Sequence, residues 1–287
     1  MAEPLLNKES GDEVRQKMEA IIAQMGEMDS MVVAFSGGVD SSLVAALAVE
    51  AIGDGVQAVT AVSETLAGRE LQEAKEVAAE VGVRHELIEF SELDDERFRA
   101  NTPSRCFFCQ SMRFEEIRQI ADRVDAEVVA SGTNASDTGD HRPGLEAMRR
   151  QGIYQPLLEH DVSKAEVREM ARILGLSVWN KPAMACLSSR IPHGLEVTEK
   201  RLRRIERAED HLYDLGFEQF RVRAHGDLAR IEIAVDELDE ALSAEMRATL
   251  GRRVREAGFL RAVLDMGGYR SGSLNPTTTT TKGNSSE

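Results

Sequence analysis

The stretch AFSGGVDSSL, residues 34–43, decides how this sequence folds. The apolar run MVVAF (31–35) leads into it, two glycines follow, and an apolar, alanine-rich segment begins directly after Ser42. This order predicts a buried strand, a tight turn and a helix. Because the N-terminus of a helix presents unpaired N–H groups and the positive end of the helix dipole, the turn predicts an anion site.

The residue types of this turn suit a polyphosphate. Gly37 and Gly38 let the backbone come close to a phosphate, and the hydroxyls of Ser36, Ser41 and Ser42 add donors. The loop has neither the lysine of GxxxxGK[ST] nor the spacing of GxGxxG, which disfavours both the usual P-loop and a dinucleotide fold. The alternative is a turn rich in small residues between a strand and a helix.

SGGVDSS resembles the PP-loop of the ATP pyrophosphatase superfamily, which includes GMP synthetase, NAD synthetase and the tRNA thiolases. The resemblance implies cleavage of ATP between its α and β phosphates, with Asp40 as a carboxylate for Mg²⁺. The residues that it assigns to ATP and pyrophosphate are Ser36, Gly37, Gly38, Val39, Asp40, Ser41 and Ser42. SGTNASD (131–137), with Asp137, resembles the second strand-end element of this superfamily, on the same carboxyl edge of the sheet.

Strands and helices alternate along the first two thirds of the chain. We expect strands at 31–35, 56–63, 84–90 and 126–134, and helices at 11–28, 43–53, 68–82, 112–124 and 163–175. This alternation predicts an α/β domain whose parallel sheet is covered on both faces.

After residue 195 the order changes, and it predicts a smaller α+β domain. Its expected elements are a helix at 198–216, two strands within 217–235, a helix at 237–258 and a closing strand at 259–266. We therefore expect a PP-loop ATP pyrophosphatase domain at 1–194, an α+β substrate domain at 195–275 and a disordered polar tail at 276–287.

The composition limits the classes of function. A formal charge of −15 over 287 residues argues against broad binding to nucleic acid, because such binding neutralises phosphates. No apolar run is long enough to cross a bilayer and the N-terminal segment does not resemble a signal peptide, so we expect a cytoplasmic protein that does not bind membranes. An odd number of cysteines, three, disfavours a disulfide framework.

The three cysteines are candidates for chemistry. RCFFCQ places Cys106 and Cys109 at CxxC spacing just before the expected helix at 112–124, where two thiols can share a metal or form a redox pair. Cys186 lies in the polar segment KPAMACLSSRIPHG (181–194). Three thiolates fit a 4Fe–4S cluster with one iron lacking a protein ligand. The alternatives are a zinc site with a fourth ligand and three unrelated reduced thiols.

Several motifs together resemble the LarE family of ATP-dependent sulfur transferases. KPAMACLSSRIPHG, RVRAHGDLARIEI and LDMGGYRSGSLN agree with the PP-loop, and the likeness runs from about residue 13 to 275. The resemblance implies that a carboxylate of pyridinium-3,5-biscarboxylic acid mononucleotide is adenylated and converted to a thiocarboxylate, in the biosynthesis of the nickel-pincer nucleotide cofactor. It also allows a homo-oligomer.

The family implies two sources of sulfur. In one branch, a lone cysteine at the position of Cys186 gives up its own sulfur and becomes dehydroalanine. In the other, Cys106, Cys109 and Cys186 would hold a 4Fe–4S cluster whose open iron carries a sulfide supplied by a sulfur donor. Because all three thiols are present, the sequence fits the cluster branch.

Ser189 and Arg190, which follow Cys186 in the sequence, are candidates for binding an anionic substrate. Ser189 and Arg190 resemble a phosphate contact of the family, and the arginine fork suits phosphate. Cations stabilise thiolates, and Arg190 lies close in sequence to Cys186. The alternative is an exposed cation on a loop.

The second domain offers further candidates. Arg221 and Arg223 share one face of an expected strand and would suit a phosphate or carboxylate, although such arginines can also simply face solvent. By resemblance, Glu209 and Glu232 contribute to a metal site.

Three alternative functions remain open. A tRNA thiolase uses the same loop and cysteine chemistry, but would need a basic surface. An amide-forming PP-loop ligase would need no cysteine. A non-catalytic nucleotide-binding module would bind ATP without forming pyrophosphate.

Overall fold

The computed structural model describes residues 8–138, 143–182 and 185–270. Contacts divide the chain into two units, Met1–Leu187 with Val197–Glu199, and Ser188–Glu196 with Lys200–Glu287. The first division therefore falls between Leu187 and Ser188, where we expected one boundary after Gly194. Cys186 belongs to the first unit, and Arg190 to the second. The tail expected at 276–287 lies outside the described residues.

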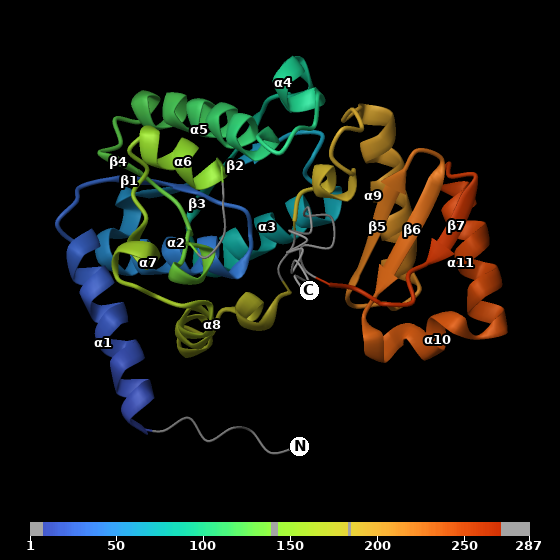
Figure 1. Ribbon diagram of the computed structural model, residues 1–287. Helices are drawn as coiled ribbons and strands as arrows, with labels where there is room; N and C mark the ends of the chain where they lie inside the picture. The colour runs from blue at the N-terminus through green and yellow to red at the C-terminus, as the bar shows by residue number, and fades with distance from the viewer. Residues whose placement is uncertain (1–7, 139–142, 183–184, 271–287) are drawn as a thin grey trace, which may run out of the picture. The chain divides into compact units, whose positions relative to one another are not determined.

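The first unit is built on a parallel sheet of four strands, β1 (Met31–Ala34), β2 (Val56–Val62), β3 (Arg84–Glu89) and β4 (Val128–Ala130). Their order is β3-β2-β1-β4 (Figure 1). β1 pairs in parallel with both β2 and β4, and β2 pairs in parallel with β3. The expected α/β class with a parallel sheet is confirmed.

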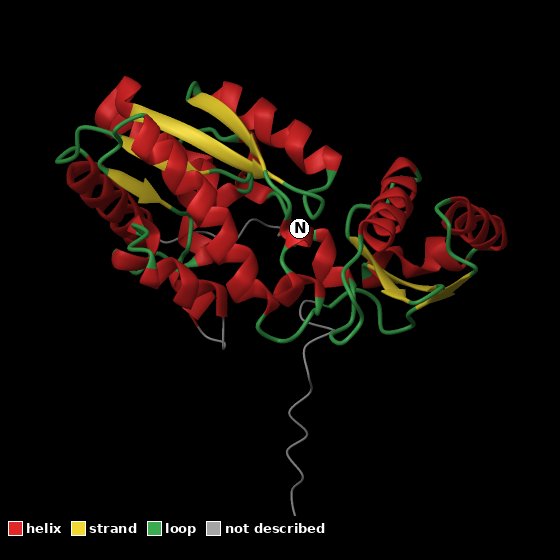
Figure 2. Cartoon of the chain, turned by 90° about the horizontal axis from the view of Figure 1, so that it is seen from above, coloured by secondary structure: helices red, strands yellow, loops and turns green. Residues whose placement is uncertain are grey.

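Helices cover both faces of this sheet (Figures 1 and 2). On one side lie α1 (Lys8–Met25), α2 (Val39–Ile52), α3 (Gly68–Val81) and α8 (Lys164–Ile173); on the other lie α5 (Arg105–Arg123) and α6 (Pro143–Arg150). The short helices of the unit are η1 (Gly53–Gly55), η2 (Glu92–Asp94), α4 (Glu96–Arg99), η3 (Ala135–Thr138), α7 (Pro156–Glu159), η4 (Ser177–Asn180) and η5 (Leu187–Arg190), of which η5 runs into the second unit.

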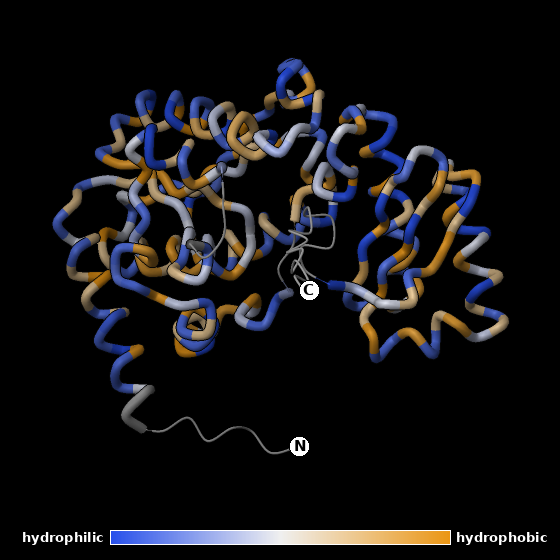
Figure 3. The backbone as a smooth tube through the Cα atoms, viewed as in Figure 1, coloured by the Kyte–Doolittle hydropathy of each residue, from blue (hydrophilic) through white to orange (hydrophobic). Residues whose placement is uncertain are grey.

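Burial on both faces explains why β1 is a continuous apolar run. Met31 and Val33 belong to the core formed with α1, α2 and α8, whereas Val32 belongs to the core that includes Phe114 and Ile117 of α5. Burying one such side chain stabilises the fold by about 1.5–3 kcal/mol. Along α5 the hydropathy alternates between hydrophilic and hydrophobic segments, as expected for a helix with one buried side (Figure 3).

Helix α5 begins seven residues before the helix that we expected at 112–124. Cys106 and Cys109 therefore lie in its first turns and not before it. Cys109 is buried on the same helix as Phe114 and Ile117, so the buried side of α5 extends to its N-terminus.

The second unit contains α9 (Glu199–Asp214) and a sheet of β5 (Phe220–His225), β6 (Leu228–Ile233) and β7 (Arg261–Leu264) in the order β5-β6-β7. β5 and β6 are antiparallel, and β6 and β7 are parallel. The helix expected at 237–258 is divided into α10 (Leu238–Leu242) and α11 (Ala244–Glu256), with η6 (Val235–Glu237) before them. The division occurs because the Ser243 side chain caps α11 by accepting a hydrogen bond from the Met246 N–H.

Over the described ranges, no helix has both the length and the apolar character needed to span a bilayer.

Candidate functional site

The PP-loop joins the carboxyl end of β1 to the first turn of α2. Gly37 has a φ of +69°, and a Cβ atom on it would lie 2.6 Å from the Cα of Ala74, so only glycine fits. Gly38 occupies the N-cap position of α2 and brings no side chain to the helix N-terminus. This geometry is compatible with an anion bound by backbone N–H groups at the end of β1, and phosphate binding there stays a prediction.

Ser41 holds the shape of this loop. Its hydroxyl donates to the carbonyl of Gly38 (3.1 Å) and accepts from the backbone N–H of Ser36 (3.1 Å). The Ser36 and Ser41 hydroxyl oxygens are also 3.1 Å apart. Ser41, which we expected to bind phosphate, thus positions the turn itself.

Asp40 lies where three segments meet. Its Oδ1 accepts a hydrogen bond from Asn134 Nδ2 (2.9 Å), and its Oδ2 lies 2.5 Å from Lys164 Nζ. The backbone N–H of Lys164 donates to the Ser136 hydroxyl (3.0 Å). About a quarter of the Asp40 side chain is exposed (26%), so a carboxylate and an ammonium group are both accessible beside the phosphate loop.

The second strand-end element packs directly on the PP-loop. A Cβ atom on Gly132 would lie 2.6 Å from the backbone nitrogen of Ser41 and 2.7 Å from the carbonyl carbon of Asp40. Asn134 follows and contacts Asp40, whereas Asp137 accepts a hydrogen bond from the Asn134 N–H (3.3 Å). Asp137 therefore supports the turn that carries Asn134.

Lys164 was not among the residues expected from the sequence, although a signal for it existed. It is the first residue of α8, which begins with a capping box formed by Ser163 and Glu166. A cation in the first turn opposes the helix dipole, so a lysine there is unfavourable unless an anion lies nearby. That anion is Asp40.

These residues suit ATP with Mg²⁺. A partly exposed carboxylate at the N-terminus of a helix is a suitable oxygen ligand for Mg²⁺. Lys164 supplies a positive charge that the loop itself lacks. The group can therefore neutralise polyphosphate with one lysine, the helix N-terminus and a metal bound to the carboxylate.

The two cysteines of the CxxC pair have different environments. Cys106 is exposed, whereas Cys109 is buried and its thiol donates to Glu92 Oε1 (2.8 Å). Burial raises the pKa of the Cys109 thiol well above its ordinary value; Arg113 opposes the shift and Glu92 adds to it. Cys109 is therefore held as a neutral thiol.

Cys186 is partly buried at the end of the first unit. The N–H of the next residue, Leu187, donates to the carbonyl of Thr65 (2.9 Å), which fixes this segment beside the carboxyl end of β2. Lys181 pairs with Glu70 (3.1 Å) and Glu73 (2.5 Å) on α3. The guanidinium of Arg113, on α5, interacts electrostatically with Cys186.

The thiols match the ligand type of an iron–sulfur cluster, but their placement does not match a common ligand set. Within the described ranges, no group of three or more His, Cys, Asp or Glu residues is arranged to hold a metal ion. Cys109 is engaged with Glu92, and Cys106 is exposed. The cluster stays a prediction from the sequence.

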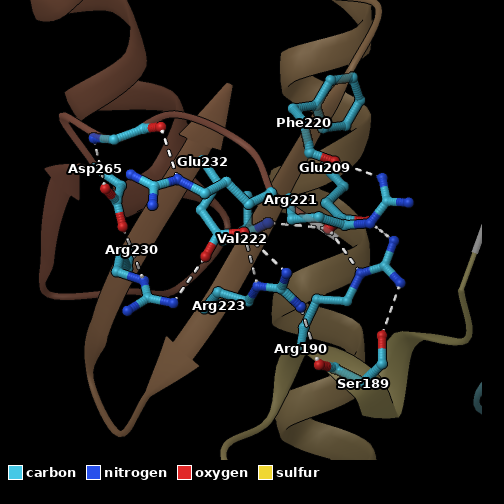
Figure 4. A network of polar contacts seen from close by, with 12 residues as sticks. Ser189, Arg190, Glu209, Phe220, Arg221, Val222, Arg223, Arg230, Glu232 and Asp265 are labelled. Atoms are coloured by element: carbon cyan, nitrogen blue, oxygen red, sulfur yellow. Dashed lines mark hydrogen bonds and ion pairs between the residues drawn. The ribbon is translucent and has the colours of Figure 1, made fainter. Parts of the chain in front are cut away.

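The arginines expected to bind substrate belong to a buried network in the second unit (Figure 4). Arg190, only 1% exposed, forms two hydrogen bonds of 2.9 Å with the carboxylate of Glu209. Arg223 bonds Glu232 at 3.0 and 2.8 Å, and Arg230 lies 2.7 Å from the second oxygen of Glu232. The carboxylates expected to bind a metal are thus paired with these arginines.

Arg221 and Arg223 share a face of β5, as the alternation predicts. The Arg221 guanidinium lies 5.0 Å from the ring centroid of Tyr269 and donates to the carbonyl of Phe220 (2.6 Å). Burial lowers the pKa of Arg221, and the nearby Arg190 lowers it further.

The charges of this network favour an anion. Three buried arginines, Arg190, Arg221 and Arg223, accompany two buried carboxylates, and Glu209 offsets part of the repulsion between Arg221 and the neighbouring arginines. Ser189, whose hydroxyl accepts from Arg190 (3.1 Å) and whose carbonyl accepts from Arg223 (3.1 Å), lies at its edge. Among the described residues of the second unit, the buried arginines of the network are Arg190, Arg221 and Arg223, whereas the buried Arg204 lies apart and pairs with Asp227. The buried carboxylates of the network are Glu209 and Glu232.

Comparison with known proteins agrees with the PP-loop found in the first unit. A sequence model of the asparagine synthase family matches residues 13–103, which include the PP-loop. An uncharacterized protein of Synechocystis sp. is 39% identical over 91% of this chain and 98% of its own length. A tRNA-specific 2-thiouridylase of Beijerinckia indica is 32% identical, over 53% of this chain and 44% of its own length.

A third relative carries a specific name. The pyridinium-3,5-bisthiocarboxylic acid mononucleotide synthase of Lactiplantibacillus plantarum is 36% identical over 92% of this chain and 95% of its own length. Because the likeness spans 92% of the chain, it extends over both units. The chain therefore belongs to the family of that synthase, the LarE family of ATP-dependent sulfur transferases.

Proposed function

We propose that this protein adenylates a carboxylate of pyridinium-3,5-biscarboxylic acid mononucleotide and replaces one carboxylate oxygen by sulfur. The observation that carries the proposal is a shared sheet edge. The PP-loop follows the carboxyl end of β1, and Thr65, which bonds the residue after Cys186, follows the carboxyl end of β2. Because adjacent parallel strands end on the same side, the nucleotide loop and the thiol segment share the edge where such folds bind ligands.

In the first step, a carboxylate oxygen of the substrate attacks the α-phosphorus of ATP. The bond to the bridging oxygen of the β-phosphate breaks, and pyrophosphate leaves. The N-terminus of α2 and Lys164 stabilise the negative charge of the leaving pyrophosphate. Mg²⁺, when bound at Asp40, offsets the charge of the triphosphate.

In the second step, a sulfur nucleophile attacks the carbonyl carbon of the acyl adenylate, and AMP leaves. With Cys186 as the nucleophile, the product is a thioester. Loss of the Cα proton and cleavage of the Cβ–Sγ bond then release the thiocarboxylate and leave dehydroalanine at position 186. Cys109 is a poor nucleophile, because it is buried as a neutral thiol.

The second unit is proposed to hold the anionic groups of the substrate through Ser189, Arg190, Arg221 and Arg223. The support is the excess of buried guanidinium groups over buried carboxylates. Glu209 and Glu232 orient these arginines, and a metal role for them stays a prediction.

The alternative sulfur source is a 4Fe–4S cluster on Cys106, Cys109 and Cys186. The support for it is the number and type of the thiols in the first unit. Dependence of repeated turnover on iron and sulfide would favour it over Cys186 itself. A homo-oligomer and a cytoplasmic location also stay predictions.

A tRNA thiolase is a second candidate, favoured by the likeness to a tRNA-specific 2-thiouridylase over about half of the chain. The net charge of −15 disfavours it. A filter-binding measurement with bulk tRNA at 150 mM salt separates the two, and we expect no retention of tRNA.

The test of adenylation measures pyrophosphate released from Mg-ATP with and without the pyridinium biscarboxylate nucleotide. We expect release only with the nucleotide, and we expect Asp40→Asn to abolish it. Release from the Asp40→Asn variant at the wild-type rate would contradict the assignment of the loop.

A further inference from the structure

A buried carboxylate that the proposed mechanism does not use lies beside the thiols. Glu92, in η2 after β3, is fully buried at 0% exposure. Its Oε2 accepts hydrogen bonds from the hydroxyls of Ser63 and Thr65, both at 2.6 Å. Its Oε1 accepts from the thiol of Cys109 (2.8 Å) and from Arg113 (3.1 Å).

A fully buried carboxylate is tolerated only when hydrogen-bond donors satisfy both of its oxygens. Burying an ionised carboxylate without hydrogen bonds would be strongly unfavourable, because the charge would lose its solvation without replacement. Here it has four donors, one of which is a cation. The donors come from two segments, the loop after β2 and the N-terminal part of α5, so Glu92 joins both to its own short helix.

Thr65 links Glu92 to the segment that carries Cys186. Its hydroxyl donates to Glu92, while its carbonyl accepts the N–H of Leu187 at 2.9 Å. Leu187 is buried at 2% exposure and directly follows Cys186. A shift of Thr65 would therefore move the segment that carries the proposed nucleophile.

Arg113, on α5, also links Glu92 to Cys186. It pairs with Glu92 and interacts electrostatically with both Cys109 and Cys186. The carboxylate of Glu92 thus positions the thiol of Cys109, the guanidinium of Arg113 and the hydroxyl of Thr65. The carbonyl of Thr65 in turn accepts the hydrogen bond from the segment that carries Cys186.

We propose that Glu92 is a positioning residue of the sulfur-transfer step, which fixes the Cys186 segment through Thr65 and the thiol-bearing helix α5 through Cys109 and Arg113. This inference rests on the proposed function. Glu92 contacts neither the PP-loop nor Asp40 in the interactions described, so its effect falls on the second step and not on adenylation.

The experiment uses Thr65→Val, which removes the hydroxyl, Thr65→Ser, which keeps it, and Glu92→Gln. The control is Ser91→Ala, which removes a bond of equal length (2.6 Å) between the same two loops, from Ser91 to Glu64, without touching Glu92. Each full-length protein is assayed for pyrophosphate release and for thiocarboxylate formation. We expect Thr65→Val and Glu92→Gln to lower thiocarboxylate formation at least tenfold while pyrophosphate release stays within twofold.

Thr65→Ser should restore the rate of thiocarboxylate formation, and Ser91→Ala should leave it unchanged. Pyrophosphate release and thiocarboxylate formation that fall together in Thr65→Val would show a general structural role and overturn the inference. So would a Thr65→Ser variant that is no better than Thr65→Val.

A second readout does not depend on the substrate. At a fixed pH, the rates at which methyl methanethiosulfonate modifies Cys109 and Cys186 are followed by peptide mass spectrometry. Because Glu92→Gln changes the contacts that position both segments, we expect it to change the rates at Cys109 and Cys186, with Ser91→Ala matching the wild type. If the wild type forms no pyrophosphate with the pyridinium nucleotide, the proposed function fails, while unchanged modification rates in Glu92→Gln would overturn the positioning role separately.

Discussion

Lys164 Nζ lies 2.5 Å from Asp40 Oδ2, although 124 positions separate the two residues in the chain. The contact brings a lysine from the N-terminus of α8 to a phosphate loop that has no lysine of its own. It therefore supplies, from a distant segment, the cation that the usual P-loop carries within its motif.

Lys164→Met should lower pyrophosphate release about 100-fold, the size of effect seen when one stabilising donor is removed from a transition state. The measurement is the initial rate of pyrophosphate release at saturating Mg-ATP. Lys17→Met is the matched control, because Lys17 pairs with Glu166 near the start of the same helix and is not bonded to Asp40. Equal losses in both variants would contradict a specific role for Lys164.

Gly132→Ala should also lower adenylation, because its Cβ would lie 2.6 Å from Ser41 N and force the two strand-end elements apart. Misplacement of reacting groups by about 1 Å can cost about 100-fold in rate. We expect at least a tenfold loss in pyrophosphate release. The control is Gly11→Ala, whose Cβ would have no atom within 4 Å in the described structure; a fully active Gly132→Ala variant would contradict the close packing.

The Arg190–Glu209 pair predicts a specific pattern of stability. Arg190→Met leaves Glu209 buried without its cation, and removing one partner of a buried pair costs about 3–5 kcal/mol. The double variant Arg190→Met with Glu209→Gln should recover part of that loss. Urea unfolding of the wild type, both single variants and the double variant measures the coupling, and additive losses would show that the two side chains do not interact.

Glu166 predicts a dependence of stability on pH. Burial alone would raise its pKa, but hydrogen bonds from Lys17 and Ser163 lower it below the ordinary value. A lowered pKa in the folded state stabilises the protein above the unfolded pKa, and this contribution is lost as the pH falls through the folded pKa. Glu166→Gln should therefore reduce stability most near pH 7, and its effect should shrink progressively as the pH falls below the ordinary pKa of 4.5, as urea unfolding over a series of pH values can show.

Local patterns explain why much of the fold was predictable. The strand, glycine turn and helix around the PP-loop follow from adjacent residues, and so does the capping box of Ser163 and Glu166. Alternation placed Arg221 and Arg223 on one face of a strand. The family, the α/β class and the ATP-dependent sulfurtransferase activity expected from the motifs are supported by the fold and the named relative.

Partners distant in the sequence were not predictable in the same way. Proximity in sequence suggested Arg190 as a cation for Cys186, but gave no signal for the buried pair that Arg190 forms with Glu209, 19 positions away. Glu92 gave no signal because it lies in an acidic segment, SELDDE, in which it looks like any exposed carboxylate. Its burial depends on Ser63, Thr65 and Arg113, which only the folded sheet brings together.

The central claim is sulfur transfer to an adenylated carboxylate, and one mass spectrum tests it most directly. An anaerobic reaction of the protein with Mg-ATP and pyridinium-3,5-biscarboxylic acid mononucleotide is analysed for small molecules and for intact protein. The account predicts a thiocarboxylate product and a protein lighter by the elements of hydrogen sulfide at Cys186. Product with Cys186 intact, in a reaction that needs added iron and sulfide, would assign the sulfur to a cluster. Pyrophosphate without any thiocarboxylate under both conditions would contradict sulfur transfer.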